Sequence, residues 1–160
     1  MIRKLLLLMG TLFFLAVRPA LAMPEIRYDH QTFHPDTLSY DLKGNVSVKV
    51  GSRVITADEA VVSLLTNEVR AKGNIRLVQD DLTFTGSAAV VRQSTHSADV
   101  DGPLTFVREG LEIRADRGSF DWESKLARFE GHVRCKRAGQ AEIKKDVLIY
   151  NVEKDTFQEA

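Results

Sequence analysis

The chain has 160 residues, of which 44% are hydrophobic and 28% charged, and its 22 basic and 22 acidic side chains give a formal net charge of zero. This balance gives no indication of nucleic-acid binding, and the single cysteine, Cys135, excludes an intrachain disulfide framework. The length suffices for one domain with a substantial hydrophobic core.

Residues 1–22 have the pattern of a secretory signal peptide. Arg3-Lys4 form a charged start, residues 5–17 are an apolar run, and Ala20-Leu21-Ala22 is a small-residue cleavage pattern. The apolar run is shorter than the roughly 20 residues that a membrane-spanning helix needs. We therefore predict cleavage after Ala22 and export of a soluble protein, with an uncleaved membrane anchor as the alternative. Removal of this segment leaves 19 basic and 22 acidic side chains.

Residues 23–35 are predicted to form an N-terminal lead-in. His30 and His34 have the i, i+4 spacing at which a helix could bind zinc, but Pro35 and the surrounding β-like sequence argue against a helix, so no metal site is expected. We expect Tyr28 and Phe33 to pack on the segment that follows.

Glycines recur at a constant interval of 29 residues through the rest of the chain. They are Gly44, Gly73, Gly102 and Gly131. A period of this length indicates one supersecondary unit that is copied and stacked around a shared core. We therefore predict that residues 36–155 form an all-β domain, an elongated stack of four 29-residue repeats with two or three strands each.

Each glycine is followed by alternating apolar and polar residues, which is typical of a strand with one buried face. In the third repeat, for example, Leu104 and Phe106 flank Thr105. The glycine itself is expected to supply a bulge or tight bend at the same place in every repeat. Cys135 occupies the position that Phe106 has in the third repeat, so it is interpreted as a small buried hydrophobic residue.

A second anchor follows each glycine by eleven or twelve residues. It pairs an apolar residue with a short polar one three positions later: Ile55 with Asp58, Phe84 with Ser87, Ile113 with Asp116, and Ile143 with Asp146. We interpret the polar residues as corners that hydrogen-bond nearby backbone groups. Paired carboxylates could alternatively serve a polysaccharide-cleaving β-helix. The regular placement favours the structural interpretation, and no catalytic set is identifiable, so we do not expect an enzyme.

Two interpretations of the apolar interior remain open at this point. A tight β-stack would be filled by its own side chains, whereas a stack that opens along one side would leave a lengthwise apolar groove. Periodicity alone does not distinguish them.

The segment from Leu42 to Val62 resembles the OstA-like family of Gram-negative export proteins, with a Gly-Asn-Val strand, a glycine turn, Ile-x-Ala-Asp and an apolar pair. The pattern recurs in degraded form over nearly all of residues 36–150. Within the family, the signal peptide, short chain and absence of a second domain resemble the periplasmic bridge of lipopolysaccharide transport. The second repeat departs from the pattern at Gly86-Ser87, and the fourth has Lys144 and one extra residue, so the last unit could be a loose end or a partner-facing cap.

The resemblance implies a folded-over, jelly-roll-like sheet whose apolar interior shields the acyl chains of lipid A. It further implies a periplasmic location, head-to-tail stacking of copies, and contacts with inner-membrane and outer-membrane components of the export machinery. No cofactor is implied. The repeat positions that would line the groove are Val46, Val48, Ile55, Ile75, Leu77, Phe84, Leu104, Phe106, Ile113, Phe120 and Val133.

The densest basic group lies near the end of the chain and could contact lipid phosphates as charge-assisted donors. It consists of Lys136, Arg137, Lys144 and Lys145. Two alternatives to a lipid carrier remain open: an anchored inner-membrane component of the same export system, and a structural β-stack that assembles through its edges and binds no lipid.

Overall fold

The structure, a computed structural model, describes residues 25–158, with the side chain of Val50 excepted. The predicted signal peptide lies outside these residues. The described chain is entirely β, and it contains no helix that is long and apolar enough to cross a membrane. The strands are β1 Glu25–Arg27, β2 His30–His34, β3 Ser39–Val50, β4 Arg53–Ser63, β5 Glu68–Gln79, β6 Leu82–Arg92, β7 Ser97–Arg108, β8 Leu111–Asp121, β9 Leu126–Arg137, β10 Ile143–Asn151 and β11 Thr156–Gln158.

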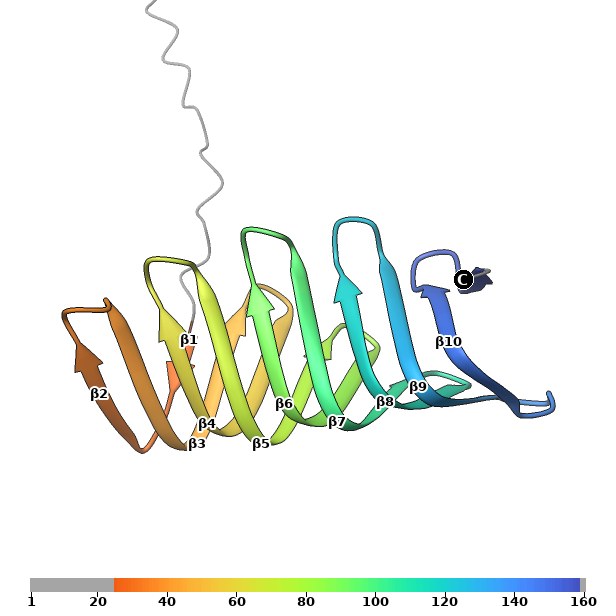
Figure 1. Cartoon of the computed structure of the whole chain (residues 1–160), viewed down its shortest axis with the longest axis horizontal. Helices are drawn as coiled ribbons and strands as arrows, with labels where there is room; N and C mark the ends of the chain where they lie inside the picture. The colour runs from red at the N-terminus through yellow and green to blue at the C-terminus, as the bar shows by residue number, and fades with distance from the viewer. Residues whose placement is uncertain (1–24, 159–160) are drawn as a thin grey trace, which may run out of the picture.

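All strands belong to one antiparallel sheet in the order β1-β3-β4-β5-β6-β7-β8-β9-β10-β11, and β2 pairs with β3 beside β1. From β2 onward each strand pairs with the next one in the chain through a short turn, so the repeats follow one another along the long axis (Figure 1). Each 29-residue repeat contributes two strands. The predicted all-β stack of repeats is confirmed.

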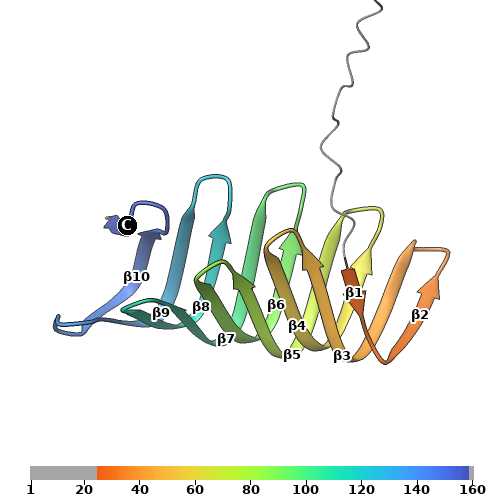
Figure 2. The ribbon, with the colours of Figure 1, turned by 180° about the vertical axis from the view of Figure 1, so that it is seen from behind.

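The sheet is folded over on itself into two layers. In Figure 1, each of the strands from β3 to β9 runs from a turn at the top of a front layer, around the bottom of the molecule, into a rear layer. Figure 2 shows the rear layer with its own row of turns, and β1 beside it. The long side opposite the fold, where front turns and rear turns approach each other, is called the mouth below.

The fold-over line coincides with the periodic glycines. The strand register shifts at each of them, for example between Lys72 and Ile75 of β5 against β6. Gly73 has a φ of 75° and Asn74 a φ of 48°. Glycine reaches this left-handed region without steric cost, and asparagine tolerates it better than most residues. The two consecutive residues therefore make a bulge that bends the strand, as the sequence predicts, and they do so in mid-strand.

Alternating side chains from both layers point into the space between them and form one hydrophobic core. The centre of this core is aromatic: the ring centroids of Phe84 and Phe106 are 4.7 Å apart, those of Phe106 and Phe129 are 5.4 Å apart, and those of Phe106 and Tyr150 are 5.9 Å apart. Such tilted arrangements are favourable for aromatic pairs. The core therefore runs without interruption along the length of the two-layered sheet.

Candidate functional site

The eleven residues predicted to line a groove all lie in this core, and each exposes 7% or less of its surface. Ten of them come from the rear layer and one, Phe120, from the front layer. The structure therefore brings the predicted set together, mainly as one wall of the interior. Whether these side chains contact a lipid stays a prediction.

The opposite wall is missing from the predicted set, although the sequence carries a signal for it. The apolar residue two positions before each periodic glycine is buried in the front layer. The residues paired with it on the adjacent strands are mostly small. These residues include Leu42, Ala60, Ala71, Ala89, Val100, Phe129 and Leu148. In the structure the two walls are in contact, so the interior is filled by its own side chains.

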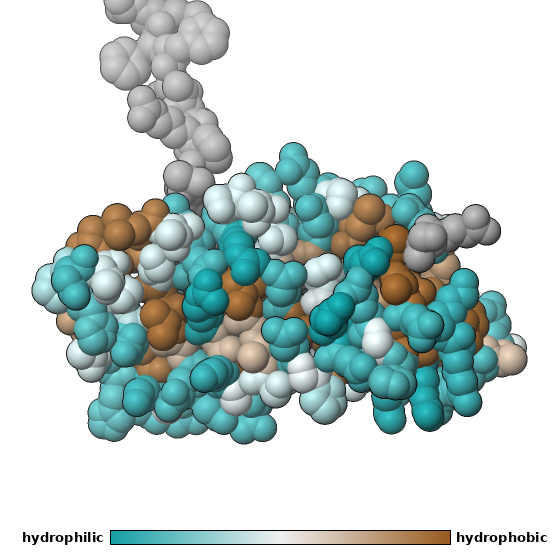
Figure 3. All heavy atoms as spheres, viewed as in Figure 1, coloured by the Kyte–Doolittle hydropathy of each residue, from teal (hydrophilic) through white to brown (hydrophobic). Residues whose placement is uncertain are grey.

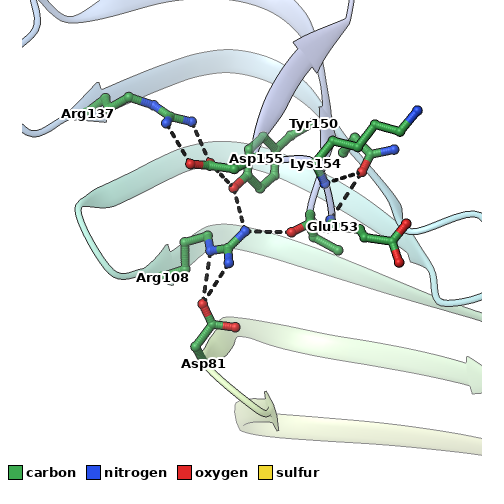
Figure 4. A network of polar contacts seen from close by, with 9 residues as sticks. Asp81, Arg108, Arg137, Tyr150, Glu153, Lys154 and Asp155 are labelled. Atoms are coloured by element: carbon green, nitrogen blue, oxygen red, sulfur yellow. Dashed lines mark hydrogen bonds and ion pairs between the residues drawn. The ribbon is translucent and has the colours of Figure 1, made fainter.

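Polar contacts join the two layers across the mouth at the C-terminal end (Figure 4). Arg108, at the end of β7 in the rear layer, donates from Nη1 to the hydroxyl of Tyr150 at 2.8 Å and to the carbonyl oxygen of Val152 at 2.6 Å, both in the front layer. Its Nε and Nη2 contact one carboxylate oxygen of Asp81 at 3.0 and 2.9 Å.

A second arginine completes this network, which we call the clasp and define as Asp81, Arg108, Arg137, Tyr150 and Asp155. Arg137, at the end of β9, donates from Nη1 and Nη2 to the two carboxylate oxygens of Asp155 at 3.0 and 2.8 Å. Tyr150 donates its hydroxyl proton to Asp155 at 2.5 Å. Hydrogen bonds from Arg137 and Tyr150 hold the pKa of Asp155 at about 2, and burial raises the pKa of Tyr150.

The middle of the mouth has a different contact. The guanidinium carbon of Arg53, at the start of β4, lies 4.4 Å from the centroid of the Trp122 ring, in the turn between β8 and β9. This distance is typical of a cation–π interaction. Trp122 is only 7% exposed because the arginine of the other layer covers it. Arg53 and Trp122 are far apart in the chain, so no local pattern indicated the contact.

The N-terminal end of the mouth is apolar and uncovered. Leu38 is 39% exposed, Leu64 51% and Leu65 66%, and the amide of Leu64 donates to the carbonyl of Leu38. Figure 3 shows apolar surface over these first turns. Tyr28 and Phe33, expected to pack on the first repeat, remain 38% and 43% exposed, although the Phe33 ring lies 4.7 Å from that of Tyr40.

The four basic residues predicted as phosphate contacts do not form one cluster. Arg137 belongs to the mouth and is paired with Asp155. Lys136, Lys144 and Lys145 are exposed, and Lys144 lies across from Arg134 in the rear layer, 3.9 Å from Glu142. Lys144 and Lys145 also belong to the half of β10 that pairs only with β9 among the described strands.

The predicted corner residues lie along the fold-over line, and Asp58, Ser87 and Asp116 are each tied to the next repeat, whereas Asp146 lies at the register shift of β10. Asn74 donates to Asp58 at 2.9 Å, the ring of His132 contacts Asp116 at 2.7 Å, and Ser87 donates to the backbone carbonyl of Asp101 at 3.0 Å. The prediction of a backbone partner is therefore correct for Ser87 and wrong for Asp58 and Asp116, whose partners are side chains. These carboxylates lie singly, each at its own bend, rather than in pairs, which supports a structural role over a catalytic one.

One member of this series was missed in the sequence. Asn45 donates to Asp29 at 2.8 Å, and Asp29 precedes Asp58 by one full period of 29 residues. Its strands, β1 and β2, pair with the two halves of β3. The neighbouring His34 contacts Asp41 at 3.2 Å. Among residues 25–158, no three His, Cys, Asp or Glu side chains are grouped as they would be around a metal ion.

Comparisons with known proteins bear on both sequence and fold. No model of a protein family matches the chain. The LPS-assembly protein LptD of Bordetella avium (strain 197N) is 39% identical over 86 residues, which cover 53% of this chain and 11% of that protein. The chain therefore spans about a tenth of the length of this relative.

A solved structure has the same fold. LptH, described as the LptA homologous periplasmic component of the conserved lipopolysaccharide transport device from Pseudomonas aeruginosa, superposes with a TM-score of 0.65 over 79% of this chain and 92% of its own, at 12% identity. The bridge protein that the sequence is predicted to resemble is LptA, of which LptH is a homologue. The chain thus combines an LptA-like fold with sequence similarity to LptD, which confirms its predicted resemblance to the OstA-like family of lipopolysaccharide-transport proteins.

Proposed function

We propose that this chain is a periplasmic carrier and bridge that shields the acyl chains of lipopolysaccharide between its two layers on the way from the inner to the outer membrane. The observation that carries the proposal is the continuous apolar core between two walls of one folded sheet. Each methylene group that leaves water for such an interior gains about 0.8 kcal/mol. An uninterrupted apolar track provides this gain at every position along it.

Loading such an interior requires the layers to move apart, because their side chains fill it in the structure. The topology supports this motion. The ladder hydrogen bonds run between neighbouring strands within each layer, whereas at the mouth the layers are joined by side-chain contacts such as Arg53–Trp122 and the clasp. The mouth can therefore widen about the fold-over line without breaking the sheet.

The strand edges at the two ends support the proposed bridge. At the N-terminal end β1 and β2 pair only with β3, and at the C-terminal end Ile143–Lys145 of β10 pair only with β9 within the described part of the chain. Unpaired strand edges are templates for strand addition. Successive copies, or the inner- and outer-membrane components of the machinery, would extend the sheet and keep the interior continuous. Self-association that rises with concentration in sedimentation velocity is the expected result, and it would disappear when proline replaces Lys144.

Photocrosslinking tests the carrier role. A photoreactive phenylalanine analogue at Phe106, whose side chain is 0% exposed in the core, should trap lipopolysaccharide in cells. The matched control is Thr105, the next residue on β7, whose side chain faces away from the core. Capture at Phe106 alone supports the proposal. Capture at neither position favours the structural β-stack, and capture at both indicates non-specific contact.

The periplasmic location rests on the predicted signal peptide. N-terminal sequencing of the exported protein should find Met23 as the first residue. Retention of residues 1–22 would instead support the rival function, an anchored inner-membrane component of the same export system.

A further inference from the structure

Two arginines occupy equivalent positions in successive repeats at the C-terminal half of the mouth, and the earlier repeats have no arginine at this position. Arg108 and Arg137 are one period apart, and the preceding members of this series are Gln79 and Val50. The side chains of both arginines are half-buried, with 20% and 23% exposed, at the boundary between the apolar interior and solvent. A guanidinium at such a boundary needs an anionic or carbonyl partner.

The two guanidinium groups differ in their buried contacts, but each is also paired with a half-exposed aspartate. Arg108 is anchored through Nη1 by Tyr150, which is fully buried, and by the backbone of Val152. Its remaining fork, Nε and Nη2, contacts Asp81, whose side chain is 51% exposed. Arg137 presents Nη1 and Nη2 to Asp155, 53% exposed, and among residues 25–158 its buried Nε has no hydrogen-bond partner.

The two carboxylates can therefore leave at much lower cost than the two arginines. Asp81 and Asp155 are on turns with half-exposed side chains and can rotate into water, and the Tyr150 hydroxyl that donates to Asp155 keeps its hydrogen bond from Arg108. Arg108 is held by Tyr150 and Val152, and the guanidinium carbon of Arg137 lies 5.1 Å from the centroid of the Phe157 ring. A group that replaces the carboxylates must carry negative oxygens in a geometry that fits a guanidinium fork, which phosphate does.

We propose that Arg108 and Arg137 are the phosphate-recognition pair of the cargo site, held by Asp81 and Asp155 until a phosphorylated lipid exchanges with them. The inference rests on the proposed carrier function and deepens it. Acyl chains between the layers push the mouth apart, and the phosphate groups of the same molecule then take over the guanidinium forks. The clasp thus makes opening favourable for a phosphorylated amphiphile and unfavourable for a neutral one, because a ligand shifts such an equilibrium only through its different affinity for the two states.

The test compares lipopolysaccharide with the same lipopolysaccharide after its lipid A phosphates are removed. The full chain carries the photoreactive residue at position 106, and the captured lipid is quantified in vitro. We expect a preference of about tenfold or more for the phosphorylated form, the size expected of a hydrogen bond to a charged group. The double variant R108Q/R137Q should lose this preference. The control R114Q/R134Q, with both exposed arginines on the outer face of the rear layer, should keep it.

Several outcomes would overturn the inference. Equal capture of the two lipids by the unsubstituted chain refutes phosphate recognition and leaves the carrier role intact. A preference for the phosphorylated lipid that survives in R108Q/R137Q, or that disappears in R114Q/R134Q, has the same two consequences. Capture of neither lipid refutes the carrier role as well.

The variant D81N/D155N gives an independent result if R108Q/R137Q does not fold. It keeps both arginines and removes the competing carboxylates, so capture of the phosphorylated form should increase several-fold while capture of the dephosphorylated form changes less. Unchanged or reduced capture of the phosphorylated form would contradict the exchange.

Discussion

Asp58 and Asn74 join consecutive repeats at the fold-over line. The amide of Asn74 donates to the Asp58 carboxylate at 2.9 Å, and the same carboxylate lies directly over Gly73. A Cβ atom added to Gly73 would be 2.3 Å from that oxygen. Glycine is therefore required there for two reasons, the left-handed backbone and the carboxylate that covers it, and this accounts for the unbroken 29-residue period.

Replacement of Gly73 by alanine should lower the free energy of unfolding by about 2 kcal/mol or more, because a residue with a side chain is strained in this backbone region and the new methyl group displaces Asp58. Gly51→Ala is the matched control, since Gly51 also has a positive φ, 60°, but in the described part of the chain no atom beyond its two neighbouring residues lies within 4 Å of the added Cβ. Urea denaturation of both variants gives the comparison. Equal losses would show that the Asp58 contact does not constrain the glycine.

The sequence predicted the inner face of the rear layer because period-two alternation is a local property. Leu104 and Phe106 were assigned to the core from their spacing after Gly102, and both are buried. The fold-over does not follow from that spacing, since a glycine at a strand end and a glycine at a mid-strand bulge give the same pattern. Only the family resemblance implies it.

The clasp could not be predicted from local sequence patterns, because its residues are far apart in the chain. Arg108 and Val152 are separated by 44 residues, and Arg108 ends β7 whereas Val152 directly follows β10, a strand that is not a neighbour of β7 in the sheet. Their contact follows from how far the rear layer is displaced along the front layer, which depends on the twist of the whole sheet. Arg137 was recognised as a candidate phosphate contact, but its partner Asp155 was not.

Truncation of Phe106 to alanine should lower the free energy of unfolding by about 3–5 kcal/mol, since the ring is fully buried among Phe84, Phe129 and Tyr150 and its removal leaves a cavity. Val107→Ala, at the next position on β7, removes a side chain that is 42% exposed and should change stability by no more than about 0.5 kcal/mol. Chemical denaturation of both proteins measures the difference. A small loss at Phe106 would mean that the interior is loosely packed and already adapted to an occupant.

Asp155 should make the protein less stable in acid. Its pKa in the folded protein is lowered from 3.8 to about 2, first by Arg137, so the folded state binds this proton less readily than the unfolded state. The stabilisation is fully present above the unfolded pKa and is lost as pH falls through about 2. The stability difference between the unsubstituted chain and Asp155→Asn should therefore be constant from pH 7 to about 5, decrease below pH 4 and be smallest near pH 2. High salt should reduce it at neutral pH, because the side chain is half-exposed. A difference that does not vary between pH 7 and 2 would contradict the ion pair.

Cys135 reports on whether the interior opens. It is 1% exposed, burial raises the pKa of its thiol, and it lies two residues before Arg137 on β9. A soluble aromatic disulfide reagent should therefore react slowly with the folded protein and quickly in urea, because only an exposed thiolate attacks. D81N/D155N should react several-fold faster than the unsubstituted chain, since loss of the Arg137–Asp155 ion pair removes one of the contacts that join the layers, whereas R114Q/R134Q should react at the original rate. Fast reaction of the unsubstituted chain would show an interior already open to water, and equal rates in all three proteins would show that the clasp does not control the mouth.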